Sequence, residues 1–305
     1  MMRQRITLAL IALVSTTALL SAAPAQALGK VKCDGTKQPV VAVGRYDPIV
    51  NHNGTGSEHE HQFFGNIAWH SMAKPNAANY PDLAGAANNC RSILGQSTPA
   101  DSAGYWIPSL RYHSGSKAGQ LVPAQQFTAY YRSFDHNDFG QGRAFPADTR
   151  LVATRHDWGC GQFSGVPIGP SIPSCVGQSG KPGHTLTAHV DFPSCWDGKL
   201  PNHRPSDVGN TNDNAHYAYA VKSKGSSTCP PGFPNRMVEL RETFQFAYTG
   251  PGNDISLASD AHAKVKDGET LHGDFWNTWR QADFEKFVAT CVTSSSSYTT
   301  SKCDP

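Results

Sequence analysis

The sequence predicts a mainly β protein, built as a single β-sandwich or jelly-roll-like domain with long loops and one C-terminal helix. Three observations support this fold class. The 28 glycines and 21 prolines are spread along the chain, as expected for many short strands joined by turns. Six short segments alternate apolar and polar residues or are rich in β-branched residues. One late segment instead repeats apolar residues at three- and four-residue steps, the period of a helix.

The expected strands lie at residues 38–44, 126–132, 150–156, 185–192, 215–221 and 238–248. In the segment 185–192 every second residue from Leu186 is apolar, which leaves Thr187, His189 and Asp191 together on the opposite face. His189 and Asp191 are therefore expected to be neighbours.

The segment 215–221 places His216 on one face with Ala218 and Ala220. Small side chains beside a histidine leave room for a ligand. They also suit a face that packs closely against a second sheet, so both interpretations stay open.

The expected helix begins at Phe275, with Asp274 at the N-cap position. Its apolar stripe consists of Trp276, Trp279, Phe284, Phe287, Val288 and Cys291. The chain then ends in a polar tail at residues 292–305, which Cys303 could tie back to the domain.

The N-terminus has the pattern of a signal peptide. Arg3 and Arg5 precede an apolar run from Ile6 to Leu20, and Ala25-Gln26-Ala27 supplies the small residues of a cleavage site. We expect residues 1–27 to be removed after Ala27, residues 28–291 to form one secreted β-rich domain, and the protein to be extracellular. No later segment reaches the roughly 20 apolar residues that a membrane-spanning helix needs.

Export to an oxidising space makes the eight cysteines candidates for disulfides rather than for metal thiolates. All of them follow the expected cleavage site, so four disulfides are possible. Eight cysteines allow about 105 pairings. Proximity in the sequence favours Cys160 with Cys175 and Cys195 with Cys229. The other four are Cys33, Cys90, Cys291 and Cys303.

Charge excludes some partners. The chain has 26 Lys and Arg against 24 Asp and Glu, and loss of Arg3 and Arg5 would leave it formally neutral. Nucleic acids and anionic membranes call for a basic patch, so we expect neither as a partner. We expect the protein to be a monomer.

Two histidines, His59 and His61, stand one residue apart ahead of an aromatic pair. In an extended chain residues i and i+2 point to the same face, so the two imidazoles would lie side by side. Paired imidazoles suit a metal or a proton-transfer site. Possible partners are scattered along the chain, at His189 with Asp191, at His216, and at His272 with Asp274.

These motifs resemble those of one family of secreted proteins, catalogued only as a domain of unknown function, which is common in fungi and actinobacteria and often fused to WSC modules in fungi. The order of motifs is the same over nearly the whole expected domain. Phe-Pro-Ser-Cys-Trp-Asp-Gly at residues 192–198 is the most specific of them. The others lie at residues 47–50, 57–61, 105–110 and 272–275. The resemblance implies no established reaction.

The chain departs from the family pattern at two positions. Asn214 and Phe233 stand where other members often carry histidine. The resemblance therefore implies a reduced histidine set, which consists of His59, His61, His216 and His272.

The leading hypothesis is an extracellular enzyme that cleaves a polysaccharide, as a lyase or a glycoside hydrolase. A lyase uses a histidine or tyrosine base beside a group that neutralises a uronate carboxylate. A hydrolase uses two carboxyl groups, for which Asp191, Asp197 and Asp274 are candidates. We assign substrate polarisation to His59 and His61, proton transfer to His216 and Tyr219, the cleft wall to His272 and Asp274, and substrate binding to Trp106, Trp196, Asp191 and Asp197.

Two alternatives belong to other classes. The first is a metal-binding protein in which His59, His61 and His216 hold copper or zinc. A structural calcium ion could instead bind the loop at residues 210–214. The second alternative is a non-catalytic protein that binds a glycan or the cell wall, with histidines that are hydrogen-bonded core groups. The leading hypothesis requires no cofactor.

Overall fold

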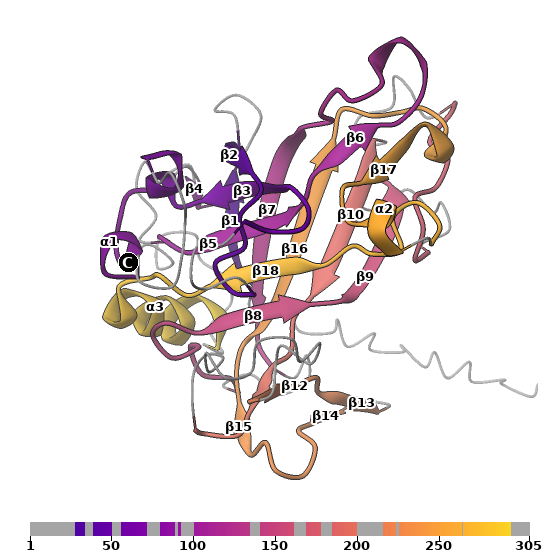
Figure 1. Cartoon of the computed structure of the whole chain (residues 1–305). Coiled ribbons are helices and arrows are strands. Elements are labelled where there is room, and N and C mark those ends of the chain that lie inside the picture. Colours follow the sequence, from indigo (N-terminus) through magenta and orange to yellow (C-terminus); the bar gives the residue numbers. More distant parts are fainter. Residues whose placement is uncertain are drawn as a thin grey trace, which may run out of the picture.

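The computed structural model (Figure 1) describes residues 28–33, 39–50, 56–71, 80–88, 91–92, 101–134, 141–161, 169–177, 185–199, 216–223, 226–263 and 265–293. The expected signal peptide, the loop at residues 210–214 and most of the polar tail lie outside these residues. No described helix is long and apolar enough to cross a bilayer.

The larger of the two main sheets, sheet A, has six antiparallel strands in the order β4-β1-β7-β16-β10-β9. Their bounds are β4 (Arg91–Ser92), β1 (Leu28–Cys33), β7 (Ala124–Arg132), β16 (Glu239–Phe246), β10 (Leu186–Asp191) and β9 (Arg155–Cys160). In β10 the side chains of Leu186, Ala188 and Val190 are fully buried in the core. This is the face that the alternation predicts.

The second main sheet, sheet B, has five antiparallel strands in the order β2-β3-β5-β18-β8. Their bounds are β2 (Val40–Gly44), β3 (His61–Gly65), β5 (Gly104–Pro108), β18 (Gly273–Trp276) and β8 (Arg150–Ala153). All residues of β3, β5 and β18 are buried, so both faces of this sheet are covered.

The two sheets pack face to face through aromatic side chains. The ring of Phe64 in β3 lies 5.1 Å from that of Phe127 in β7 and 5.0 Å from that of Phe244 in β16. Tyr105 in β5 lies 4.8 Å from Phe127. Residues from both sheets form one buried cluster, which is the core of a sandwich. The mainly β fold predicted from the sequence is confirmed.

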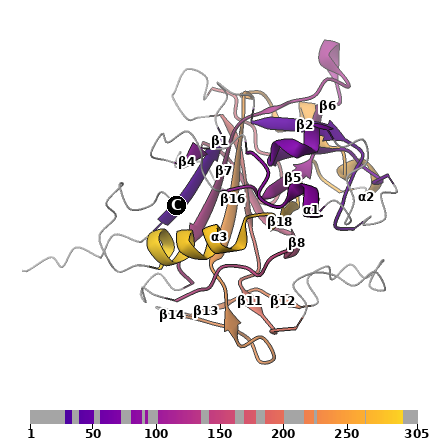
Figure 2. The ribbon, with the colours of Figure 1, turned by 90° about the vertical axis from the view of Figure 1, so that its left-hand side faces the viewer.

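Smaller elements extend this sandwich. Three short strands pair in the order β12-β11-β15. The consecutive strands β13 and β14 form a hairpin-like pair, and β17 pairs with β6 from a distant part of the chain. Strands β12, β13 and β14 lie together at one end of the molecule in both views (Figures 1 and 2). The bounds are β6 (Leu110–Tyr112), β11 (Cys195–Trp196), β12 (Tyr217–Ala218), β13 (Val221–Ser223), β14 (Ser226–Thr228), β15 (Asn235–Arg236) and β17 (Ile255–Leu257).

The helices are short. They are α1 (Tyr80–Leu83), α2 (Asp260–Ala263) and α3 (Gln281–Phe287), and α3 continues as a π-helical turn over Val288–Val292. Single 3₁₀ turns occupy Ile67–Ser71, Gly115–Lys117 and Gly252–Asp254. The predicted C-terminal helix is thus present, but it is shorter than expected.

The beginning of that helix was predicted wrongly. Residues 273–276 form strand β18, so Asp274 does not cap a helix. Phe275 points into the sandwich, 5.7 Å from Tyr105, whereas Trp276 points outward and lies 5.8 Å from Trp69. Alternate facing is the pattern of a strand, and the apolar residues on both faces hid it behind a helical spacing.

Two predicted strands are each divided. Residues 150–156 form the end-to-end strands β8 and β9, which belong to different sheets and are separated at Thr154. The chain therefore turns from one layer of the sandwich to the other at this point. Residues 217–218 and 221–223 form separate strands β12 and β13, and Ala215 lies outside the described residues.

Two disulfides confirm the pairings that proximity favoured. Cys160–Cys175 ties the end of β9 to the loop that follows, and Cys195–Cys229 ties β11 to the loop after β14. Cys90 and Cys303 lie outside the described residues.

Candidate functional site

One end of sheet B places two histidines on the same row. The register pairs His61 of β3 with Pro108 of β5, and Trp106 of β5 with Asp274 of β18. When the second pairing is continued by two residues, His272 falls beside Pro108. Because paired residues point to the same side of a sheet, both imidazoles lie on the outer face of sheet B, which is turned away from sheet A.

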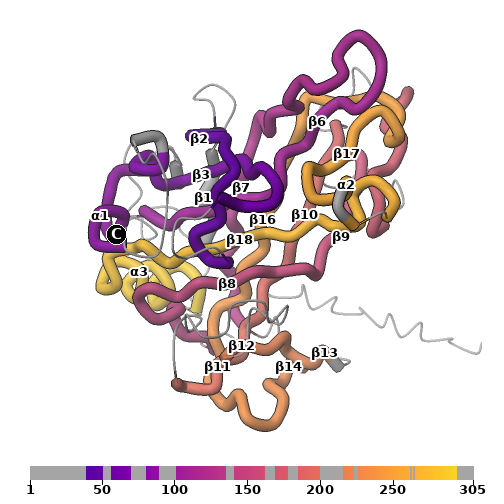
Figure 3. Tube along the Cα trace, in the orientation of Figure 1, coloured from indigo at the N-terminus to yellow at the C-terminus, as the bar shows by residue number. Residues whose placement is uncertain are grey.

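His59 joins this row from the segment that leads into β3. It lies two residues before His61, and the extended chain sends both side chains to one face. The Ser109 amide donates a 2.7 Å hydrogen bond to the Glu60 carbonyl, and the Arg45 guanidinium donates to two further carbonyls of the segment. These bonds hold the N-terminal segment, indigo in Figure 3, close to the late strand β18.

The three imidazoles converge through their Nε2 atoms. The Nε2 atom of His272 lies 3.3 Å from that of His59 and 3.4 Å from that of His61. One ligand atom from each of the three side chains fits within a span of 4.8 Å. Within the described part of the chain this is the one group of three metal-ligating side chains gathered so closely.

The other ring nitrogens of two of these histidines contact backbone carbonyls. His61 Nδ1 lies 2.7 Å from the Tyr46 carbonyl oxygen, and His272 Nδ1 lies 3.0 Å from that of Thr270. A carbonyl oxygen can only accept, so Nδ1 carries the proton in both rings. In the neutral form of such a ring the lone pair is on Nε2, the atom that each of these two rings turns toward the other. This second-shell arrangement is the one that orients metal-binding histidines.

The surroundings keep His61 uncharged. His61 has no exposed surface, and burial, followed by the neighbouring His272 and His59, lowers its pKa well below the usual value. His59 and His272 are half-buried, so the cluster opens toward solvent on their side. Neutral imidazoles are the form that binds metal.

Two buried carboxyl groups lie next to the cluster. Asp274 has no exposed surface, and its Oδ2 atom lies 3.8 Å from His272 Nε2. Glu242 of sheet A lies on the other side of β18, where a Cβ atom on Gly273 would come within 2.9 Å of its Oε2 atom. Glycine at that position lets the Glu242 side chain pack against the strand. Burial raises the pKa of Glu242 well above its usual value, which favours the protonated carboxyl.

The expected ligand His216 does not belong to this group. Its Nδ1 atom lies 2.8 Å from Oδ2 of Asp197, in the region of the small strands β11 and β12. The contact with His216 and a backbone bond from Lys199 outweigh the desolvation of Asp197, so its pKa is lowered. The structure therefore replaces His216 by His272 in the candidate ligand set.

Other residues expected at a common cleft are distributed elsewhere. Tyr219 stacks under the Arg155 guanidinium, with 4.0 Å from the guanidinium carbon to the ring centroid. Trp106 has no exposed surface and packs among aromatic rings, so it is a core residue and no sugar can stack on it. Trp196 is half-buried and stacks on Tyr217.

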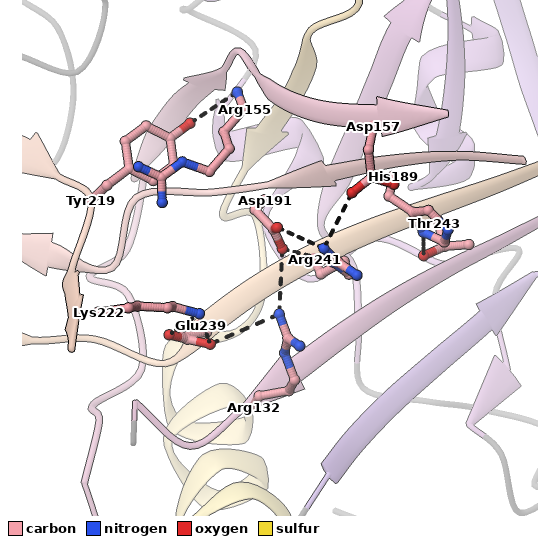
Figure 4. A network of polar contacts seen from close by, with 10 residues as sticks. All are labelled: Arg132, Arg155, Asp157, His189, Asp191, Tyr219, Lys222, Glu239, Arg241 and Thr243. Carbon is pink, nitrogen blue, oxygen red and sulfur yellow. Dashed lines mark hydrogen bonds and ion pairs between the residues drawn. The ribbon is translucent and has the colours of Figure 1, made fainter. Parts of the chain in front are cut away.

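Asp191 belongs to a network of charged side chains on the outer face of sheet A (Figure 4). Arg241 donates two 2.7 Å hydrogen bonds to it, and Arg132 approaches to 3.3 Å. Burial alone would raise the pKa of Asp191, but the bonds and charge of Arg241 outweigh it, so the pKa is lowered. His189 donates to or accepts from the Thr243 hydroxyl at 2.9 Å.

The cations of this network were not expected from the sequence. Arg132 and Arg241 each occupy a polar position of an alternating strand, which could have marked them as a pair on one face. Their partnership with Asp191 depends on the order of β7, β16 and β10 in the sheet, which alternation does not reveal.

Comparison with known proteins agrees with the motifs. A family model described as a domain of unknown function (DUF1996) matches residues 47–279, so the chain belongs to this family. The matched segment includes all three clustered histidines. No curated protein and no solved structure shows a significant match to the chain.

Proposed function

We propose that this member of the family binds one transition-metal ion, zinc or copper, through His59, His61 and His272. One observation carries the proposal. The Nε2 atoms of His61 and His272 face each other at 3.4 Å, and both rings have their proton on Nδ1. When both rings are neutral, two lone pairs at this distance repel each other unless an electrophile lies between them. A metal ion satisfies both nitrogens at once.

The two separations that involve His272 suit a tetrahedral ion. Bonds of about 2.0–2.1 Å from zinc to histidine nitrogen place two tetrahedral ligands about 3.3–3.4 Å apart. The two measured Nε2 separations are 3.3 and 3.4 Å. Imidazole donors favour zinc and copper, whereas calcium takes oxygen ligands. Three histidines leave a fourth position for water or substrate, as in catalytic zinc sites.

The neighbouring residues would complete the centre. His61 is fully buried, whereas His59 and His272 are half-buried. A ligand could therefore reach the bound ion from the side of these two residues. Asp274 has a carboxylate oxygen 3.8 Å from the His272 nitrogen and would supply an acceptor beside a bound ion. A bound ion supplies Lewis acidity there and lowers the pKa of bound water.

Metal content of the purified full chain, measured by mass spectrometry after incubation with zinc or copper and removal of excess, tests the proposal. We expect about one ion per chain, and a loss of affinity of at least roughly a hundredfold in His61→Ala and His272→Ala, since each removes one of three ligands. His216→Ala is the matched control and should keep full affinity.

Other outcomes contradict the proposal. Equal metal content in His272→Ala and in the unchanged protein would overturn it. Retention by His272→Ala combined with loss in His216→Ala would restore the ligand set expected from the sequence.

The hypothesis of a polysaccharide-cleaving enzyme can now be restricted to one site. Of the residues proposed to act in catalysis, His59, His61, His272 and Asp274 lie together, whereas His216 pairs with Asp197 elsewhere. We therefore propose that any cleavage of an extracellular polysaccharide takes place at the metal centre. Reducing-sugar release and the absorbance of unsaturated products should appear with the metal-loaded chain and be absent from the chelated one. Activity that persists without metal would exclude this extension while leaving the binding proposal intact.

A further inference from the structure

The segment that carries His59 lies outside the strands and is held by side contacts. Strand β3 begins at His61, so residues 57–60 belong to neither main sheet. His61 and His272 are each fixed further by a contact from Nδ1 to a backbone carbonyl. The position of His59 as the third histidine of the cluster therefore depends on what holds this segment.

Arg45, the residue that follows strand β2, contacts the segment through its side chain and its backbone. Its Nε atom lies 3.4 Å from the carbonyl oxygen of Ser57, and its Nη2 atom donates to the carbonyl of Glu58. The Ser57 amide donates a 2.9 Å hydrogen bond to the Arg45 carbonyl. The Ser57 hydroxyl lies 3.4 Å from the amide nitrogen of His59. Arg45 is thus joined to the residues that lead into His59.

The guanidinium of Arg45 is directed at the backbone and not at an acid. The carbonyls of Ser57 and Glu58 accept no other hydrogen bond from the described residues. No carboxylate of a described residue lies within 4.0 Å of the Arg45 side chain. A guanidinium holds several donors in one fixed plane, so it can bind two carbonyls of one segment at once.

The peptide that follows His59 is fixed by other residues. The Ser109 amide donates a 2.7 Å hydrogen bond to the Glu60 carbonyl, and Arg111 donates two bonds of 3.0 and 2.6 Å to the Glu60 carboxylate. Two groups therefore hold the side of Glu60, whereas the preceding side relies on Arg45. Loss of the Arg45 side chain should loosen that preceding side alone.

We infer that Arg45 is a positioning residue of the histidine cluster, which fixes His59 where it acts as the third metal ligand. The inference rests on the proposed metal site and names the residue that controls its third ligand. Arg45 acts through the backbone of residues 57–59. Without its guanidinium, His61 and His272 keep their own contacts, and the site has two well-placed ligands in place of three.

The charge of Arg45 allows the sign of the effect to test the inference. A positive charge near a cation site weakens metal binding, so its removal would raise the affinity if charge were the main effect. Loss of positioning lowers the affinity, because residues that orient ligands typically contribute about 10–100-fold. The two effects have opposite directions, so a lower affinity identifies positioning.

The test measures the affinity of the purified full chain for Cu²⁺ and for Zn²⁺ by competition with a chelator of known affinity. We expect Arg45→Met, which removes every donor, to weaken binding by roughly 10–100-fold. Arg45→Lys should recover part of the loss, because an ammonium group can still donate to one of the carbonyls. Arg143→Met removes an exposed arginine elsewhere and should leave the affinity unchanged. Circular dichroism shows whether each variant is folded.

A double-mutant cycle separates positioning of His59 from a general loss of structure. If Arg45 acts through His59, Arg45→Met should change the affinity by less than about twofold in a His59→Ala background, because the residue that it positions is already absent. The electron paramagnetic resonance spectrum of copper-loaded Arg45→Met should also differ from that of the unchanged chain in the direction of His59→Ala.

Three results would each overturn the inference and leave the metal site standing. They are an affinity of Arg45→Met equal to or above that of the unchanged chain, an equal cost of Arg45→Met with and without His59, and a copper spectrum of Arg45→Met identical to that of the unchanged chain. Absence of a bound ion from the unchanged chain is a different result, which would overturn the proposed function and this inference with it.

Discussion

The outer faces of the two main sheets differ in kind, although both sheets contribute to the same core. On sheet B, the outer face consists of aromatic rings such as Phe63, Trp106 and Trp276, and it is covered by Trp69 and neighbouring residues. On sheet A, the outer face consists of ion pairs around Asp191. The first face leads to three clustered histidines and the second to a set of charged side chains.

The difference shows how each kind of site is sheltered or exposed. Neutral imidazoles that share a small space need an environment that does not protonate them, and a buried aromatic face provides it. Guanidinium groups stay charged, so they can lie on a face that water reaches. The inner faces are alike, and the outer faces determine the chemistry.

The largest expected effect is the loss of stability on truncating Trp106, on the outer face of sheet B. Trp106 belongs to a second buried hydrophobic cluster, on the outer face of sheet B. Trp106→Ala should therefore lower the free energy of unfolding by about 3–5 kcal/mol, because removing a fully buried indole leaves a cavity. Urea unfolding of the chelated chain measures this. Trp196→Ala, at a half-buried position, should cost clearly less. An unchanged stability of Trp106→Ala would mean that this face is a surface after all.

The pH dependence of the free energy of unfolding tests the charged face of sheet A through His189. Burial and the charge of Arg241 lower its folded pKa to about 4, below the unfolded value near 6.5. Between pH 6.5 and 4 the imidazole of His189 binds a proton in the unfolded chain but not in the folded chain. The free energy of unfolding therefore falls as the pH falls. The largest possible loss is about 3 kcal/mol.

The measurement is the free energy of unfolding against pH, with chelator present in every sample. His189→Gln can keep a hydrogen bond to Thr243 and should flatten the profile between pH 4 and 6.5. His113→Gln, at an exposed position, serves as control. A His189→Gln profile parallel to that of the unchanged chain would contradict the prediction.

The smallest expected effect is at Asp191. Asp191→Asn weakens the pairing with Arg241 and Arg132, and we expect a loss of about 1 kcal/mol at neutral pH, since the side chains are partly exposed and screened. Because the pKa of Asp191 is lowered, its stabilisation is present above the unfolded pKa and is lost as the pH falls through the folded value. Urea unfolding at two salt concentrations measures both effects.

The dependence of this stability loss on salt distinguishes an ion pair from a packing contact. The cost of Asp191→Asn should shrink at high ionic strength, whereas the cost of Trp106→Ala should not. Asp82→Asn, an exposed position on α1, is the control for the loss of one negative charge. A cost of Asp191→Asn that is independent of salt would indicate a packing role instead.

Prediction from the sequence succeeded where one face of a strand is polar. The strands β7, β10 and β16 of sheet A alternate, and their segments were identified before the structure. The strands β3, β5 and β18 were not identified, because residues such as Phe63, Phe64 and Phe275 are buried on both faces. A strand covered on both sides does not alternate, and its sequence resembles that of a buried helix.

The candidate site was predicted in part for a similar reason. Residues i and i+2 of an extended chain share a face, so the pairing of His59 with His61 follows from the sequence alone. The choice of His272 over His216 as their partner does not, because it depends on the lateral order of β3, β5 and β18.

The sequence by itself determined the mainly β fold, the family and the pairing of His59 with His61, and it favoured the two disulfides that the structure contains. These depend on local periodicity, on short separations along the chain, or on motifs. Only the tertiary structure decided that His272 completes the cluster and that Trp106 is a core residue. Such decisions depend on which distant strands become neighbours, and that order is set by packing of the whole sandwich.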